Sequence, residues 1–589
     1  MARKKNRYTG KEDPLAIARE RFRTINTAET PIRANALENL RFVYNVDGGQ
    51  WPEKIREERQ NDSRPCLTSN KLRKYVAQVV NRERDQRVVG KVRPVDDKGD
   101  LQRAAIIEGL IRQIEYQSNA QEVYTTAGEA AVAGGFGYWQ IITKESTDSF
   151  SQEILLKKIE NQFSVYLDPR GEFAFIREGM TCKEFKDRYP DKLEDDFDLS
   201  GVGDEYTLWY ESDKIFIADY YFKEYYDKKI ALIVDGTGNS KIVELTDEIT
   251  PEILSFNGYS ILKEKTVKAP KVKWQRITGH DILEEGEWVG DDIPIIEVYG
   301  DKFNIGGKQY KNALVNDAKD PQRAYNFWLT SMTETVALAP KSPYLVTPQE
   351  IKGHEQQWND ANKKNYAYLL VNQQGTNSKP RREPPPQIPT GAAQMLQLSA
   401  ADIQDTIGMY QASFGERSNE RTGVAIRERA GRSEFGTYHF GDNFKRAVLA
   451  STKQLINIIP KIYDDERIIR ILGEDGNDEL VKINETTVNL ETGEELIVND
   501  LTVGKYDVVA EVGMYSTRRQ EAVEMMTSLM QASPNISPLM LDLVFKYADW
   551  PGAQEIKERL NKNMNALLGG KGGEATMDST GGQTPTETF

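Results

Sequence analysis

The sequence predicts an α+β fold with an elongated helical part. Long segments with apolar residues at helical spacing occur in both halves of the chain, and short alternating β-like runs fill residues 138–300. The 589 residues are enough for several modules with cores of their own, roughly four by length.

Residues 13–46 are predicted to form two helices, because Asp13-Pro14 and Thr30-Pro31 each resemble a cap followed by proline. The segment 69–86 is predicted to be a helix with one buried stripe, formed by Leu72, Tyr75, Val76, Val79 and Val80. Its other faces are basic and either touch DNA or form a solvated or subunit-facing surface: Lys71, Arg73, Lys74, Arg82 and Arg84.

Two further helices precede the β-rich region. The first carries Ile107, Leu110, Ile111 and Ile114, and the second is rich in alanine and ends at the glycine cluster 134–137. This cluster runs from helix to strand, the reverse of a phosphate-binding loop, so it is interpreted as a tight turn. Strands are then predicted at 138–143, 164–167, 214–221, 229–234 and 294–299.

Two rod-like helices flank a compact insert. The first, 320–339, has Asp320 as its cap, Pro321 at its first position and Pro340 as its stop; at 1.5 Å per residue it is roughly 28 Å long. The second covers 391–410. Between them, extended pieces are predicted at 344–347 and 366–371, and the proline-rich residues 379–386 are interpreted as a stiff polyproline-II linker, with a docking ligand as the alternative.

The C-terminal third begins with a charged, glycine-interrupted loop, 411–423. A long helix at 424–462 is expected to bend at Gly431, Gly436 and Gly441. Two β-like runs, 481–488 and 495–498, precede three helices at 517–531, 538–548 and 552–566. The Gly- and Thr-rich residues from 569 onward are expected to be disordered.

Composition and motifs give no reason to assign an enzyme. There is no GxxxxGK[ST] phosphate loop, the three histidines (His280, His354 and His439) are far apart, and Cys66 and Cys182 are the only cysteines. We therefore predict no catalytic residue, no metal ligand and no cofactor. No apolar run approaches about 18 residues, so no membrane partner is expected.

The string Asp320-Pro321-Gln322-Arg323, with Asn326, Glu334 and Ala339-Pro340-Lys341, resembles the portal (head-to-tail connector) proteins of short-tailed bacteriophages. Further similarity lies in residues 64–97, in the wing-like run 181–190, and in Gly49-Gln50-Trp51. The resemblance covers most of residues 35–565 and is closest to the Salmonella-phage type. The sequence shows no heptad run after residue 566, so we expect no long C-terminal barrel.

The resemblance implies a ring-forming portal fold divided along the chain. It implies a wing (1–316), a first stem helix (317–340), a clip (341–390), a second stem helix (391–410), a tunnel loop (411–423), a long kinked helix with a return to the wing (424–510), a helical crown (511–566) and a disordered tail (567–589).

The resemblance also implies a function without catalysis. Such a ring, a dodecamer in assembled members of the family, is the DNA channel at one capsid vertex of the virion, assembled in the host cytoplasm and used for genome packaging, retention and ejection. Its partners are double-stranded DNA in transit, the terminase large subunit, the major capsid and scaffolding proteins, and the head-completion and tail proteins. The net charge of −14 argues against tight DNA binding but is compatible with a channel through which DNA slides.

Two sets of site residues follow from this layout. The tunnel loop would bring Glu416, Arg417, Asn419, Glu420 and Arg421 to the DNA, and the clip would present Lys379, Arg381, Arg382 and Glu383 to the terminase or an adaptor. Without the resemblance, 411–423 is an ordinary polar surface loop. The alternatives are a head–tail adaptor or other structural virion protein, and a packaging enzyme.

Overall fold

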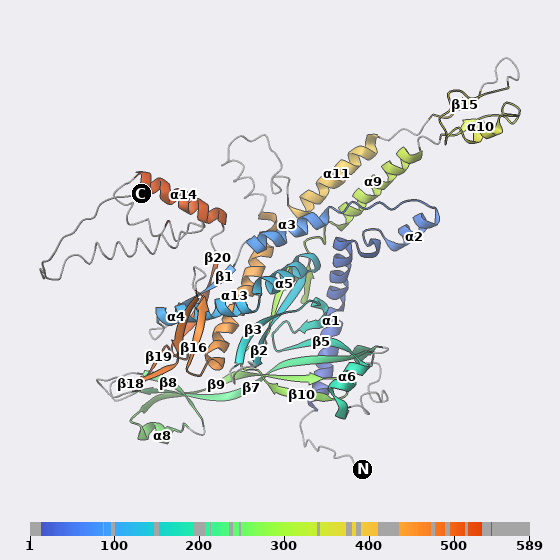
Figure 1. Cartoon of the computed structure of the whole chain (residues 1–589). Helices are drawn as coiled ribbons and strands as arrows, with labels where there is room; N and C mark the ends of the chain where they lie inside the picture. Colours follow the sequence, from blue (N-terminus) through green and yellow to red (C-terminus); the bar gives the residue numbers. More distant parts are fainter. Residues whose placement is uncertain are drawn as a thin grey trace, which may run out of the picture.

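The computed structural model describes residues 13–85, 88–95, 100–145, 152–192, 206–211, 214–234, 240–246, 249–338, 342–372, 380–384, 390–409, 435–472, 478–488, 495–512 and 516–532, together with Val544. Figure 1 shows an elongated molecule in which the sheets gather at one end. Two helices project away from the sheets and carry a small module at their far end. Helices and strands both contribute extensively, in agreement with the predicted α+β class.

A single long helix, α1 (Pro14–Tyr44), replaces the two helices predicted for residues 13–46, so that prediction is wrong. Pro31 lies inside α1, where it cannot donate a hydrogen bond to the preceding turn. Thr30 does not cap a new helix, because its hydroxyl donates to the carbonyl of Asn26 at 2.6 Å. Buried side chains on both sides of the proline, among them Phe22 and Phe42, hold the two halves in one rod.

The other N-terminal helices agree with the sequence patterns. They are η1 (Val46–Gly48), α2 (Glu53–Asn61), α3 (Leu72–Asp85), α4 (Leu101–Gln117) and α5 (Ala120–Gly134). The predicted stripe of α3 is confirmed, since all five of its residues are buried. Gly135 ends α5 with a φ of 107°, so the glycine cluster is a helix-to-strand turn as predicted.

An antiparallel seven-stranded sheet forms the lower end of the molecule in Figure 1. Its order is β10-β9-β7-β5-β4, and β6 and β8 also pair with β7. Its strands are β4 (Val165–Leu167), β5 (Phe173–Thr181), β6 (Tyr210–Glu211), β7 (Lys214–Val234), β8 (Ser240–Leu245), β9 (Ser260–Ile277) and β10 (Ile282–Glu287). Strand β7 is continuous, so the prediction of two separate strands at 214–221 and 229–234 is wrong.

Short helices connect the strands of this sheet. They are η2 (Gln162–Ser164), α6 (Cys182–Arg188), η3 (Pro190–Lys192), α7 (Tyr206–Trp209) and α8 (Pro251–Phe256). Helix α6 begins with a capping box in which Thr181 and Glu184 bond each other's backbone N–H groups. This box explains the start of the wing-like run 181–190.

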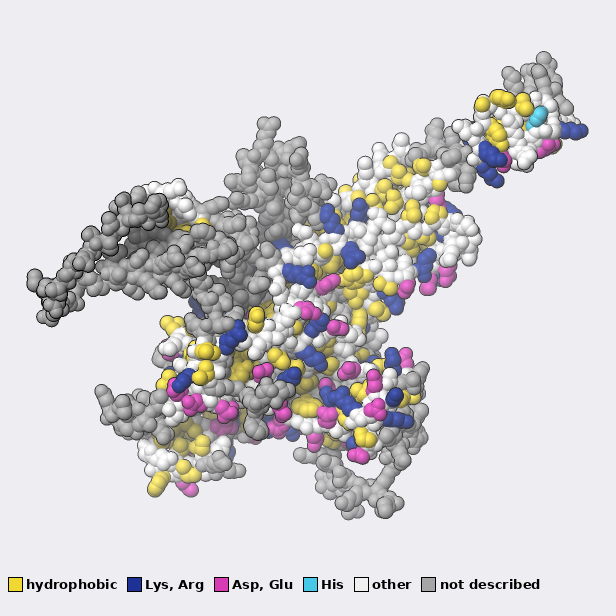
Figure 2. Space-filling view, in the orientation of Figure 1, with side chains coloured by type: hydrophobic (Ala, Val, Ile, Leu, Met, Phe, Trp, Pro, Cys, Tyr) yellow, Lys and Arg dark blue, Asp and Glu magenta, His cyan; other side chains and the backbone are white. Residues whose placement is uncertain are grey.

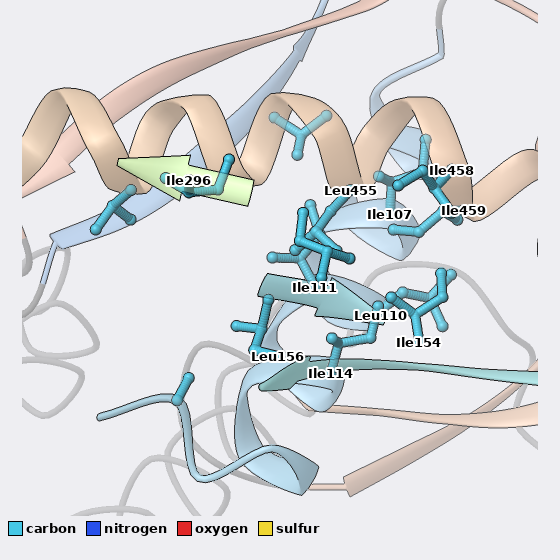
Figure 3. Packing of buried hydrophobic residues seen from close by; sticks show 14 of the residues in the cluster. Ile107, Leu110, Ile111, Ile114, Ile154, Leu156, Ile296, Leu455, Ile458 and Ile459 are labelled. Atoms are coloured by element: carbon cyan, nitrogen blue, oxygen red, sulfur yellow. The ribbon is translucent and has the colours of Figure 1, made fainter. Parts of the chain in front are cut away.

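The main core lies between helices and a second, three-stranded sheet, β11-β2-β3, built from β2 (Phe136–Glu145), β3 (Gln152–Lys158) and β11 (Ile295–Tyr299). Figure 3 shows Ile107 and Ile111 of α4 facing Leu455 and Ile459 of α13 (Tyr438–Ile462), with β3 below. The predicted apolar stripe of α4 is therefore part of the largest core cluster.

Strands from the C-terminal third complete this body. Strand β1 (Val88–Pro94) pairs with β20 (Tyr506–Val512), and two hairpins are formed by β16 (Arg467–Leu472) with β17 (Asp478–Ile483) and by β18 (Glu485–Val488) with β19 (Glu495–Val498). The run predicted at 481–488 is two strands, because Asn484 has a φ of 53° and breaks it. A last hairpin, β12 (Asp301–Ile305) and β13 (Lys308–Asn312), precedes the projecting helices.

The two projecting helices are α9 (Lys319–Leu338) and α11 (Thr390–Ile407), which agree with the two predicted rods. Asp320 lies in the first turn of α9 and not at its cap, since the helix already begins at Lys319. The module at their far end contains β14 (Tyr344–Leu345), α10 (Glu355–Asn359) and β15 (Arg381–Arg382). None of the helices in the described ranges is both long and apolar enough to cross a membrane.

The remaining helices follow α11. A 3₁₀ turn, η8 (Phe435–Thr437), leads into α13, so Gly436 precedes the helix and Gly441 lies within it. The predicted residues 424–434 of that helix, including Gly431, lie outside the described residues. Helix α14 (Ser516–Ala532) confirms the helix predicted at 517–531, whereas those at 538–548 and 552–566 and the tail lie outside the described ranges apart from Val544.

Candidate functional site

The projection, defined as α9 and α11, carries apolar side chains on its outer surface. On the inner face of α11, Ile403 and Ile407 are buried. The outward apolar side chains are between 42% and 55% exposed: Phe327, Val336, Met395 and Leu398. Figure 2 shows hydrophobic side chains along this part of the molecule. Since nothing in the described part of the chain covers them, a neighbouring molecule is the natural means of burying them.

A polar ladder runs along another face of α9. It consists of four side chains spaced four residues apart: Gln322, Asn326, Thr330 and Glu334. The first two accept the backbone N–H groups of Lys71 and Ser69, each at 3.0 Å. The third accepts the N–H of Leu67 at 3.2 Å. Side chains of α9 thus accept hydrogen bonds from every second backbone N–H group in part of the segment 64–71. Without these acceptors, the partly buried N–H groups would have no partner.

Glu334 ends the ladder between two arginines. It pairs with the buried Arg59 and, at 3.0 Å, with the half-exposed Arg64. Its hydrogen bond raises the pKa of the Arg64 guanidinium. At the other end of α9, Glu38 of α1 pairs with both Lys319 and Arg323 at 3.2 Å. The base of the projection is therefore fixed to α1, α2 and the segment 64–71.

The sequence analysis assigned no role to this ladder. Gln322, Asn326 and Glu334 entered it only as part of the resemblance. The signal that could have identified them is the four-residue spacing of uncharged polar or acidic side chains on a helix whose other faces are apolar. The partners of the ladder lie more than 250 residues earlier in the chain, which no local pattern reveals.

The distal module, defined as residues 342–384, is small and is held largely by side chains. Tyr344 packs edge-on against Trp358 with ring centroids 5.3 Å apart. Residues 366–371, predicted to be extended, belong to no strand. Instead, Gln357 and Trp358 of α10 donate to the carbonyls of Tyr368 and Leu370 at 2.9 and 2.8 Å. Apolar side chains remain exposed on this module: Leu345, Tyr368, Leu370 and Val371.

Two of the predicted docking residues form a strand. Arg381 and Arg382 pair with Leu345 and Tyr344, so the interpretation of 379–386 as a polyproline-II linker is wrong for these residues. Both arginines are exposed, and the Arg382 guanidinium lies 5.1 Å from the centre of the Tyr344 ring. Glu383 is half-buried, and its backbone N–H donates to the Pro343 carbonyl at 3.1 Å. Lys379 lies outside the described residues.

The predicted channel residues, Glu416, Arg417, Asn419, Glu420 and Arg421, lie outside the described residues. The structure does fix the two ends of that segment. Gly408 ends α11 with a φ of 74°, and a Cβ on Gly436 would lie 2.9 Å from the Gly408 carbonyl oxygen. The two residues that flank this segment, Gly408 and Gly436, therefore lie in contact at the base of the projection.

The basic face of α3 lies beside the same base. The Lys71 ammonium lies 5.3 Å from the centre of the Tyr325 ring, and the Arg73 guanidinium lies 5.9 Å from that of Tyr44. Both side chains remain exposed. The two interpretations made from the sequence, DNA contact or solvated surface, both fit this geometry.

Two adjacent aspartates, Asp291 and Asp292, are engaged in ion pairs. Asp291 pairs with Lys461 at 2.8 Å and Asp292 with Lys223 at 2.7 Å. Within the described ranges, no group of three or more His, Cys, Asp or Glu residues is placed to hold a metal ion.

Comparison with known proteins identifies relatives over almost the whole chain. The model of the family described as phage P22-like portal protein matches residues 19–576. The chain is also similar to a portal protein of Acyrthosiphon pisum secondary endosymbiont phage 1, with 24% identity over 581 residues, covering 92% of this chain and 80% of that protein.

Proposed function

Because this chain belongs to the family of phage P22-like portal proteins, we propose that it forms the ring-shaped DNA channel at one vertex of the capsid. In this proposal, the ring admits the genome during packaging, retains it, and releases it at ejection. The family is a structural one, so the energy for packaging comes from a separate terminase.

The observation that carries the proposal is the projection with its outward apolar side chains. A closed ring places different surfaces of neighbouring copies against each other, so each copy of α9 and α11 meets the next. Burying Phe327, Val336, Met395 and Leu398 in this way removes apolar surface from water at about 25 cal/mol per Å². The same arrangement gathers the distal modules into one circle.

The portal layout then assigns a role to each part. The projection is the stem, the distal module is the clip, and the sheets and α1 to α5 form the wing. The exposed Arg381 and Arg382 of the clip dock the terminase large subunit and later the head-completion proteins. The tunnel loop, 411–423, lies toward the channel, where Arg417 and Arg421 meet DNA phosphates. The wing contacts the capsid and scaffolding proteins.

Electron microscopy and native mass spectrometry of the purified protein test the ring. We expect rings with an axial hole and a mass many times 66.9 kDa. The double variant Val336→Glu and Leu398→Glu should yield mostly monomers, because it places charge on the buried stem contact. Ile305→Glu, in the exposed β12–β13 turn, is the control and should still form rings. A parent protein that is monomeric or dimeric at every concentration and salt would contradict the proposal.

A further inference from the structure

A cavity of about 520 Å³ lies among the helices of the body of the molecule. Helices α3, α4, α5 and α13 and the end of β11 line it. Most of its wall is apolar, with Val80, Val132, Val298 and Val448 among the lining residues. Its size falls in the range of small-molecule sites, about 300–1,000 Å³.

Two carboxylates line this cavity, those of Glu83 and Glu115. The first is Glu83 of α3, which lies against the backbone of α13: a Cβ on Gly441 would come 2.7 Å from its Oε1. Its Oε2 is buried and has no hydrogen-bond partner. Burial raises the pKa of Glu83, although Arg82 and Lys445 act in the opposite direction. An unpaired buried oxygen of this kind favours a cationic partner.

The second carboxylate is Glu115 of α4. It accepts a hydrogen bond from the Tyr124 hydroxyl at 2.9 Å. Burial raises the pKa of Glu115 to about 7, with Tyr124 and Arg112 acting in the opposite direction. Arg112, which also lines the cavity, is paired with Glu108 at 2.6 Å.

The two carboxylates come from different helices. Glu83 of α3 lies against Gly441 of α13, whereas Glu115 of α4 is bonded to Tyr124, whose ring centroid lies 6.4 Å from that of Phe444. Aromatic rings also line the cavity: Tyr116, Tyr124, Tyr299, Phe440 and Phe444. Apolar and aromatic walls suit a methylene chain, and aromatic faces attract ammonium groups.

We propose that this cavity binds a linear aliphatic polyamine, with one ammonium group against Glu83 and another against Glu115. A metal ion would leave the apolar walls uncovered, and an anion would meet two carboxylates. Arg84 also lines the cavity, but its side chain is exposed and can remain in water. The proposal does not depend on ring formation.

Calorimetric titration of the full-length protein with spermidine tests the proposal. We expect saturable binding that Glu83→Gln and Glu115→Gln each weaken about tenfold or more, because each removes one charge-assisted contact. Glu252→Gln, on the exposed helix α8, should bind like the parent. Thr125→Trp, which fills the cavity and removes no carboxylate, should abolish binding even if a glutamate variant misfolds.

The pH dependence gives a second readout. The Glu115 carboxyl loses its charge as the pH falls through about 7, so spermidine should bind more weakly at pH 6 than at pH 8. Binding at pH 7 should also release protons, measured as a dependence of the heat on the buffer. Equal spermidine affinity of the parent, Thr125→Trp and both glutamine variants would overturn the proposal. It would also be overturned if the parent bound spermidine no more tightly than it binds Mg²⁺. A different result is that the parent does not bind spermidine and the Glu83→Gln variant no longer forms rings. That result would identify the occupant of the cavity as a lysine of a neighbouring subunit, and it would equally overturn the proposal.

Discussion

At the scale of single residues, buried polar contacts help to fix the projection on the body. Asn326 is the centre of the ladder. Its Oδ1 accepts from Ser69 N at 3.0 Å and its Nδ2 donates to Gln50 Oε1 at 2.8 Å. Both partners are largely inaccessible to water, so losing the amide leaves two groups unsatisfied.

Asn326→Leu should therefore destabilise the base of the projection by about 2–3 kcal/mol. The loss should appear as faster hydrogen exchange of the Leu67, Ser69 and Lys71 amides, measured by mass spectrometry of the peptide covering 64–71. Thr333→Ala, on the exposed face of α9, should change the exchange of this peptide by less than about twofold. Equal exchange in both variants would show that the ladder does not hold the segment.

A second residue-scale prediction concerns the close contact of β2 with α5. A Cβ on Gly137 would lie 2.1 Å from the carbonyl oxygen of Ala127, a distance that neither backbone can accommodate without moving. Gly137→Ala should lower the midpoint of thermal unfolding by more than about 5 °C or prevent soluble expression. Gly391→Ala, where the added Cβ has open space, should leave the midpoint unchanged or slightly raised. A Gly137→Ala protein as stable as its parent would show that α5 and β2 shift apart easily.

At the scale of elements, prediction from sequence succeeded where the pattern is local. The α3 stripe and the α4 stripe follow from helical spacing alone, and both are buried. Prediction failed where contacts between residues far apart in the sequence determine the structure. Pro31 ought to start a helix, but packing on both sides carries α1 through it. Strand β7 seemed interrupted because residues 224–227 are exposed and charged or aromatic, yet backbone pairing with β9 continues through them.

The candidate site shows the same division. The rods and the basic character of 381–382 could be predicted, because they are properties of a few neighbouring residues. The pairing of Arg382 with Tyr344 could not, because it joins residues 38 positions apart through a two-residue strand. The ladder partners were likewise beyond any local pattern. Whether 411–423 reaches DNA stays a prediction.

The clip carries the element-scale prediction. Arg381→Ala with Arg382→Ala should leave rings intact, because both side chains are exposed, and should weaken terminase capture about tenfold in a pull-down titration. Lys363→Ala, an exposed cation on the same module, is the matched control and should have little effect. Equal loss for both variants would indicate a general charge effect, and no loss for either would place the docking surface elsewhere.

At the scale of the whole molecule, the proposed channel is built from an acidic chain, so it would let DNA pass without holding it tightly. The tunnel loop combines Arg417 and Arg421 with Glu416 and Glu420, so any phosphate contacts are weakened by neighbouring carboxylates. Each cation that neutralises a phosphate adds about −0.9 to the salt slope of duplex binding, and a ring multiplies this by its subunit number.

Arg417→Ala with Arg421→Ala should therefore leave assembly normal and lower retention of packaged DNA, with a difference from the parent that shrinks at high salt. Glu416→Lys with Glu420→Lys should do the reverse and stall packaging. Genome length and leakage, measured in particles built from each variant, decide the matter. Particles of both kinds that match the parent would mean that this loop does not touch DNA, and the projection would become the next candidate for the constriction.

The unbroken α1 has a mechanical consequence. Its first half is anchored in the large sheet through Phe22, and its second half is joined to the base of the projection through Glu38 and Asn39. At 1.5 Å per residue this helix is about 46 Å long. In the proposed ring, a force applied to the distal module by a packaging motor would therefore have a path to the sheets along one helix. Pro31 is the point at which α1 bends most easily, because one backbone hydrogen bond of the helix is missing there.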